Sequence, residues 1–148
     1  MNKEGSQMAH IPNEEIGLSI YKARVLMKNK LQKKLKQYEI TAEQWNIINK
    51  IYSNEGYNQK ELAERCLKDR AALTRILDLL GKKGFIERKA SPNDRREFLV
   101  CLTEKGHELY SKIAPIVTEN AQENFKNFNE EETKQLQHLL KKLISNLN

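Results

Sequence analysis

Long apolar runs are missing from this chain of 148 residues. No stretch approaches the roughly 18–20 consecutive apolar residues that a membrane-spanning helix needs. Residues 1–7 also lack the apolar core of a secretory signal. We therefore expect a cytoplasmic protein with no membrane segment, long enough for one domain with its own core.

Cysteine is scarce, and its two copies, Cys66 and Cys101, form no CxxC pair and lie near no clustered histidines. This argues against a disulfide framework or a structural zinc site. The histidines, His10, His107 and His138, lie far apart, and HExxH, GxSxG and glycine-rich phosphate motifs are absent. We therefore expect no enzyme and assign no cofactor and no metal.

Positive charge is what the sequence has in excess, with a formal net charge of +6. Residues 58–103 hold 11 Lys and Arg against 7 Asp and Glu, whereas residues 104–148 hold 6 against 7. Residues 1–57 hold 9 against 6. A basic balance favours binding to a polyanion through counterion release, although it also fits a basic protein without such a partner.

Residues 58–84 predict two short helices joined by a tight turn. Asn58 is a suitable N-cap for the first, with Glu61 placed to complete a capping box. Asp69 is a suitable N-cap for the second, and Gly84 can take the left-handed turn that ends it. The apolar stripe of the second helix consists of Leu73, Ile76, Leu77 and Leu80.

A hairpin is predicted to follow, because the strand-like runs 85–89 and 98–102 flank a breaker-rich segment. Arg95 and Arg96 lie at its tip. A helix-turn-helix followed by such a hairpin is a winged helix. Its second helix can lie in a DNA major groove, while the hairpin reaches the backbone or the minor groove.

Helices are also predicted at both ends of the chain. After a flexible tail over residues 1–12, Asn13 caps a long helix, and Thr41 opens the next with a capping box. Thr103 caps a helix that Pro115 should bend or break. A capping box at Asn129 opens the last helix, whose apolar stripe consists of Leu136, Leu139, Leu140, Leu143, Ile144 and Leu147.

These terminal helices carry more apolar surface than a winged helix can cover, which is typical of an interface. We expect a C₂ homodimer in which residues 13–40 and 104–148 form the dimerisation region and residues 41–103 the DNA-binding region. The subunit is expected to be one compact domain, mainly α with a small β-wing. Packing of the terminal helices within a single subunit is the alternative.

The order and spacing of several short motifs resemble the MarR-type family of bacterial transcriptional regulators over about residues 13–147. The matching segments are residues 62–65 (positioning helix), 73–80 (TR-hydrophobic-hydrophobic-D-x-L recognition helix), 82–88 (entry to the wing), 91–96 (wing tip) and 99–106 (L-T-x-x-G exit). The resemblance implies a repressor that binds a pseudo-palindromic operator in double-stranded DNA, with each recognition helix in a major groove and a wing arginine in a minor groove.

Two groups of residues are candidates for DNA contact. Arg70 and Arg75 could each bond bidentately to a guanine. A salt bridge from Arg75 to Asp78 is the alternative for that side chain. The full recognition-helix set is Lys68, Arg70, Ala71, Thr74 and Arg75, and the wing set is Arg88, Lys89, Asp94, Arg95 and Arg96.

Other candidates in these sets have supporting roles. Thr74 could contact a thymine methyl or a phosphate. Lys68 and Lys89 suit phosphate contacts, which set register and salt dependence. Asp94 could accept a hydrogen bond from one wing arginine and stiffen the tip.

The resemblance also implies a small aromatic or phenolic effector, with Tyr21, Arg24, Tyr38 and Trp45 as pocket candidates. Each of these side chains could equally be a core or surface residue, and we expect Trp45 to pack in the core. Cys101 is the candidate for redox sensing, provided that a nearby positive charge lowers its pKa. A winged-helix module that binds protein or RNA is the competing function.

Overall fold

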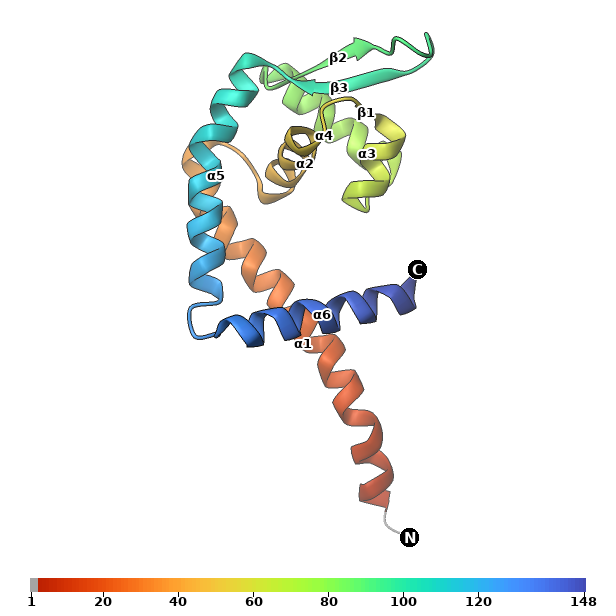
Figure 1. Cartoon of the computed structure of the whole chain (residues 1–148), viewed down its shortest axis with the longest axis vertical. Coiled ribbons are helices and arrows are strands. Elements are labelled where there is room, and N and C mark those ends of the chain that lie inside the picture. Colours follow the sequence, from red (N-terminus) through yellow and green to blue (C-terminus); the bar gives the residue numbers. More distant parts are fainter. Residues whose placement is uncertain (1–2) are drawn as a thin grey trace. The chain divides into compact units, whose positions relative to one another are not determined.

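The computed structural model describes residues 3–148, and for residues 3–12 it describes the backbone alone. The chain is mainly helical with one small sheet, as predicted. Its elements are α1 (Lys3–Leu35), η1 (Lys36–Tyr38), α2 (Ala42–Ser53), β1 (Tyr57–Asn58), α3 (Gln59–Cys66), α4 (Arg70–Lys82), β2 (Ile86–Ala90), β3 (Phe98–Leu102), α5 (Glu104–Asn124) and α6 (Glu130–Leu147) (Figure 1). Within residues 3–148, no helix combines the length and apolar character that crossing a bilayer requires.

The predicted helix caps form through local hydrogen bonds. Thr41 Oγ1 accepts from the Gln44 N–H, and the Gln44 side chain accepts from the Thr41 N–H, both at 3.0 Å. Asn58 accepts from the Glu61 N–H at 2.8 Å, although the described structure contains no return bond from the Glu61 side chain. Asp69 caps α4, and a second complete capping box opens α6. These caps fix where the helices begin.

The wing belongs to a three-stranded antiparallel sheet with strand order β1-β3-β2, so the predicted two-stranded hairpin was incomplete. β3 is the central strand, and its Val100 pairs with Tyr57 of β1 on one side and with Arg88 of β2 on the other. Residues 57–58 were not predicted as a strand because a run of two residues, the second of which is the N-cap of α3, carries no detectable alternation.

The core of the unit Met1–Ala114 lies where α2, α3 and α4 pack on one side of the sheet (Figure 1). Trp45 is 3% exposed and stacks on Tyr110 with ring centroids 5.2 Å apart, so its prediction as a core residue is confirmed. The side chains that are most completely buried there are Leu35, Ile40, Ile47, Ile48, Ile51, Leu62, Leu73, Leu77, Leu80, Val100 and Ile113.

The first helix begins earlier than predicted. α1 starts at Lys3 and runs through Pro12 and Asn13, so the backbone is helical where we expected a flexible tail and an N-cap. A proline inside a helix removes one hydrogen-bond donor, but the preceding residues include the strong helix formers Lys, Glu, Gln, Met and Ala. The part of the predicted tail formed by residues 1–2 lies outside the described residues.

Pro115 lies inside α5, which remains one helix from Glu104 to Asn124. We expected one compact domain, whereas the chain separates into two compact units, Met1–Ala114 and Pro115–Asn148. The boundary therefore falls at the proline that was expected to bend or break this helix.

The junction between the sheet and α5 depends on Gly106. A Cβ atom at this position would lie 2.1 Å from the carbonyl oxygen of Phe85. That oxygen accepts the Thr103 N–H at 3.0 Å, so it is already fixed by another bond. Only a residue without a side chain fits this close approach of two backbone segments.

We expect Gly106→Ala to lower the free energy of unfolding by about 2 kcal/mol or more, because the Phe85 carbonyl must shift. Urea or thermal unfolding measures the change. Gly81→Ala is the matched control, since nothing lies within 4 Å of the added Cβ on α4. It should be neutral or stabilise by up to about 1 kcal/mol. Equal effects from both substitutions would contradict the steric argument.

Candidate nucleic-acid interface

The outer face of α4 presents two arginines to solvent. Arg70 and Arg75 are exposed, and so is Ala71, whereas Leu73 and Leu77 on the inner face are fully buried. Within residues 13–148, neither guanidinium has an ion pair or side-chain hydrogen bond. The packed inner face therefore holds the helix while both arginines remain available for an external partner.

Thr74 is half-buried between Arg70 and the preceding helix. Its hydroxyl donates to the Arg70 carbonyl at 2.7 Å and accepts from the Gln59 amide nitrogen at 3.2 Å. Because the hydroxyl proton is already used inside the protein, the methyl group is the part of Thr74 best suited to an external apolar contact. The same hydroxyl ties α3 to α4.

Asp78 pairs with the wing and not with Arg75, so the alternative salt bridge considered for Arg75 is not formed. Its carboxylate accepts from the Arg88 guanidinium at 2.8 Å, and the Arg88 Nε donates to the Gln59 side chain at 3.3 Å. Arg88 lies on β2 and reaches Asp78 on α4. Spacing within one helix could not predict this contact, because it joins two different elements. The Arg88 guanidinium therefore binds α3 through Gln59 and α4 through Asp78, and so joins the wing to both helices.

The two lysine candidates are also paired. Lys68 Nζ lies 3.2 Å from Glu43 Oε1, and Lys89 Nζ lies 3.4 Å from Glu87 Oε1. The Lys68 side chain is 24% exposed and that of Lys89 is 62% exposed. The Lys89–Glu87 pair is exposed and therefore weak, so a phosphate could displace its carboxylate, whereas the Lys68–Glu43 pair is part-buried.

The wing tip is stiffened through its backbone. Asp94 accepts from the Arg96 backbone N–H at 2.9 Å, and its carbonyl accepts from Glu97 N–H at 3.2 Å. The predicted bond from a wing guanidinium to Asp94 is not present, because the carboxylate is turned toward the backbone of its own turn. Arg95 and Arg96 are both exposed, and neither guanidinium is paired within residues 13–148.

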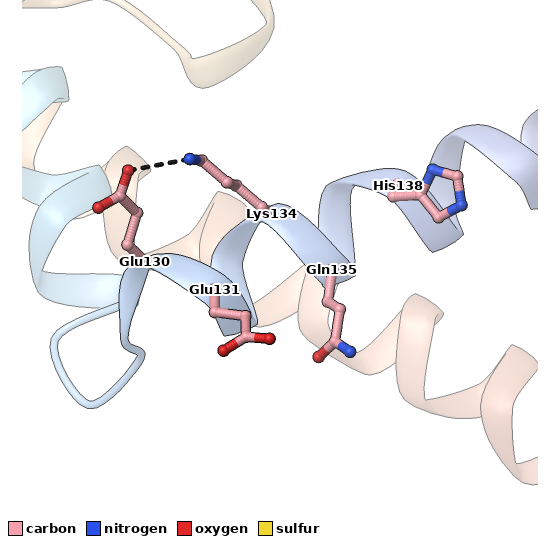
Figure 2. A pocket seen from close by; sticks show the side chains of 5 residues that line it. All are labelled: Glu130, Glu131, Lys134, Gln135 and His138. Carbon is pink, nitrogen blue, oxygen red and sulfur yellow. Dashed lines mark ion pairs between the residues drawn. The ribbon is translucent and has the colours of Figure 1, made fainter.

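The four effector-pocket candidates differ widely in exposure. Tyr21 is 69% exposed, Arg24 is exposed and Tyr38 is half-buried, whereas the Trp45 ring packs in the core. A pocket of about 560 Å³ lies elsewhere, on α6. Figure 2 shows the side chains that line it, among them Lys134 and Glu130, which form an ion pair. Its lining contains none of the four candidates and consists of Glu130, Glu131, Lys134, Gln135 and His138.

Both thiols lie in surroundings that oppose reactivity. Burial raises the pKa of Cys101; the positive charge of Lys89 lowers it in part, and the nearby carboxylates of Glu55 and Glu87 raise it again. Burial also raises the pKa of Cys66, and it outweighs the opposing positive charges of Lys50 and Lys68. Thiolate is the nucleophilic form, so these surroundings argue against redox sensing. Among the described residues, no three His, Cys, Asp or Glu side chains lie close enough to hold a metal ion.

Glu43 and Gln59 were not singled out by the sequence, although both hold candidate residues in place. Glu43 binds Lys68, which is 25 residues away, and Gln59 binds Thr74 and Arg88, which are 15 and 29 residues away. Only a prediction of how the elements pack could have found them, because helical spacing relates residues three or four apart.

A double-mutant cycle with Asp78→Asn and Arg88→Met should give a coupling free energy of roughly 0.5–1 kcal/mol, because the pair joins two elements. Urea unfolding of the four proteins measures it. Glu87→Gln with Lys89→Met is the matched control on the same strand, where side chains 49% and 62% exposed should couple negligibly. A coupling no larger than this control would refute the proposed anchor of the wing.

Comparison with known proteins places this surface in context. The MarR family model matches residues 40–98. The multiple antibiotic resistance protein MarR of Escherichia coli K12 is 36% identical over 115 residues, which cover 77% of this chain and 80% of that protein.

Two solved complexes share the fold. A mutant of MarR from E. coli complexed with operator DNA has a TM-score of 0.83 at 32% identity, covering 90% of this chain and 96% of that one. The MepR–DNA complex of S. aureus has a TM-score of 0.84 at 27% identity, covering 90% and 98%.

Proposed function

The chain belongs to the MarR family and is a DNA-binding transcriptional regulator, and we propose that it acts as a homodimeric repressor. Each subunit would lay α4 in a major groove and the β2–β3 wing in the flanking minor groove. The observation that carries this assignment is the pair of exposed arginines, Arg70 and Arg75, on a helix whose opposite face buries Leu73, Leu77 and Leu80.

In the proposed complex, α4 would read bases from its first two turns. Arg70 occupies the first turn, and a guanidinium there could bond bidentately to guanine O6 and N7. Ala71 and the Thr74 methyl group would supply apolar contacts to thymine methyls. Arg75 lies further along the same outer face and would contact a neighbouring base pair.

The wing would act through Arg95 and Arg96. A narrow, A·T-rich minor groove concentrates negative potential, and an arginine that enters it gains more than a lysine would. The turn that carries both arginines is held by the Asp94 side chain. Lys89 would contact phosphate, and the bond from Arg88 to Asp78 would keep the root of the wing against α4.

The proposed dimer rests on apolar surface at both ends of the chain. α6 has no buried residue, and its Leu139, Ile144 and Leu147 are 57%, 54% and 75% exposed. On α1, Ile16 and Leu18 are 54% and 68% exposed. Apolar surface of this kind is typical of an interface, and C₂ pairing would match a pseudo-palindromic operator with half-sites about 34–36 Å apart.

An effector also remains part of the proposal. The exposed Arg24 on α1 would attract an aromatic or phenolic anion. Tyr21 and Tyr38 would be the other members of such a site. Trp45 could join such a site only if its stacking on Tyr110 opened. Because the proposed partner is chromosomal DNA, we place the action of the protein in the cytoplasm.

Arg75→Ala and Arg96→Ala should each weaken binding to a duplex that carries the region upstream of the coding sequence. Loss of a base-contacting arginine costs about 1–3 kcal/mol, or roughly five- to 150-fold in affinity. Gel-shift titration at fixed salt measures the effect. Lys126→Ala removes the same charge from an exposed site in the connection before α6 and should change binding little. Normal binding by both arginine variants would show that the wrong surface has been assigned.

Leu139→Glu combined with Leu143→Glu should convert the proposed dimer into a monomer, because each carboxylate would have to be buried at the interface. Light scattering coupled to size exclusion gives the mass. The control is Ser145→Glu, which places one such charge on the other side of α6. Truncation after Asn129 should also give a monomer, and a dimer that survives both changes would exclude α6 from the interface.

A further inference from the structure

One carboxylate is shared by two lysines from different parts of the unit Met1–Ala114. Glu43, in the first turn of α2, places its Oε1 3.2 Å from Lys68 Nζ and 3.8 Å from Lys28 Nζ. Lys68 lies in the turn between α3 and α4, and Lys28 lies on α1. The same oxygen thus connects the long first helix to the turn of the helix-turn-helix.

This carboxylate carries its negative charge under ordinary conditions. The pKa of Glu43 is lowered, chiefly by the hydrogen bond from Lys68 and by the positive charge of Lys68. The charges of Lys28 and Arg24 lower it further, and burial opposes them. Glu43 is therefore a permanent anion at neutral pH, with three cations around it.

Lys68 occupies a place from which a DNA backbone is within reach. It immediately precedes Asp69, the N-cap of α4, and the N-terminal end of a recognition helix lies closest to the bases in helix-turn-helix complexes. Its ammonium group nevertheless lies against Glu43, and its side chain is only 24% exposed. A phosphate near this turn would draw the same ammonium group away from the carboxylate.

We propose that Glu43 restrains DNA affinity by competing with a backbone phosphate for Lys68, and that Lys28 weakens this restraint by sharing the same carboxylate oxygen. The inference rests on the proposed DNA-binding role of the turn and α4. Since phosphate contacts carry no sequence information, the restraint acts equally on every duplex. It also makes affinity depend on α1, because a shift of Lys28 changes how firmly Glu43 holds Lys68.

The test begins with Glu43→Gln, which keeps the shape of the side chain and removes its charge. We expect duplex binding to tighten roughly two- to fivefold per subunit, as for the loss of an exposed ion pair. The plot of log affinity against log salt should become steeper by about one per subunit, because one more phosphate is neutralised. Both effects should be equal on the upstream duplex and on a scrambled duplex.

The control is Glu64→Gln, an equal charge change on α3 at an exposed residue that has no ion pair within residues 13–148. It should leave the salt slope unchanged. In a Lys68→Met background, Glu43→Gln should no longer tighten binding. Lys28→Met should weaken DNA binding. The loss of affinity should be larger in the otherwise unchanged protein than in the Glu43→Gln protein.

Several outcomes would overturn the inference. Weaker or unchanged binding by Glu43→Gln would mean that the carboxylate positions Lys68 or is irrelevant to it. Tightening that persists in the Lys68→Met background would reveal a general charge effect. Unfolding midpoints measured in parallel separate these results from misfolding. If the unaltered protein bound neither duplex at any salt concentration, the proposed DNA-binding function itself would fail, and this inference would fail with it.

Discussion

Burial of the inner face of α4 is the constraint on which the rest of the interface depends. Leu73, Leu77 and Leu80 have no exposed surface, and each fully buried leucine stabilises the fold by about 1.5–3 kcal/mol. A helix fixed along this stripe cannot rotate about its axis. Arg70 and Arg75 therefore face outward, and neither guanidinium group has an ion pair or hydrogen bond to another side chain within residues 13–148.

The charged residues around α4 divide into two groups that exposure alone does not distinguish. Arg88 and Lys68 are bound to Asp78 and Glu43, whereas the guanidinium groups of the wing tip and of the outer face of α4 are unpaired within residues 13–148. A paired cation must give up its partner to meet a phosphate, so its net contribution to binding is smaller. The unpaired arginines are therefore the better candidates for readout.

Local structure was predictable from the sequence, because the interactions that set it span three or four residues. The caps at Thr41, Asn58, Asp69 and Asn129 formed as expected, and Gly84 adopts a φ of 83° at the end of α4. Long-range pairing was not predictable. β1 exists only because β3 lies beside it, and the partner of Arg88 depends on how β2 lies against α4.

Burial does not follow strand alternation at the root of this wing, as Cys101 shows. With one covered face and one solvated face, Cys101, which lies opposite Val100 and Leu102, would be exposed. β3 is the central strand, however, and all three residues are buried. The root of the wing is thus part of the core, while its tip is solvated. The arginines at the tip therefore extend from a root that is held in place by packing.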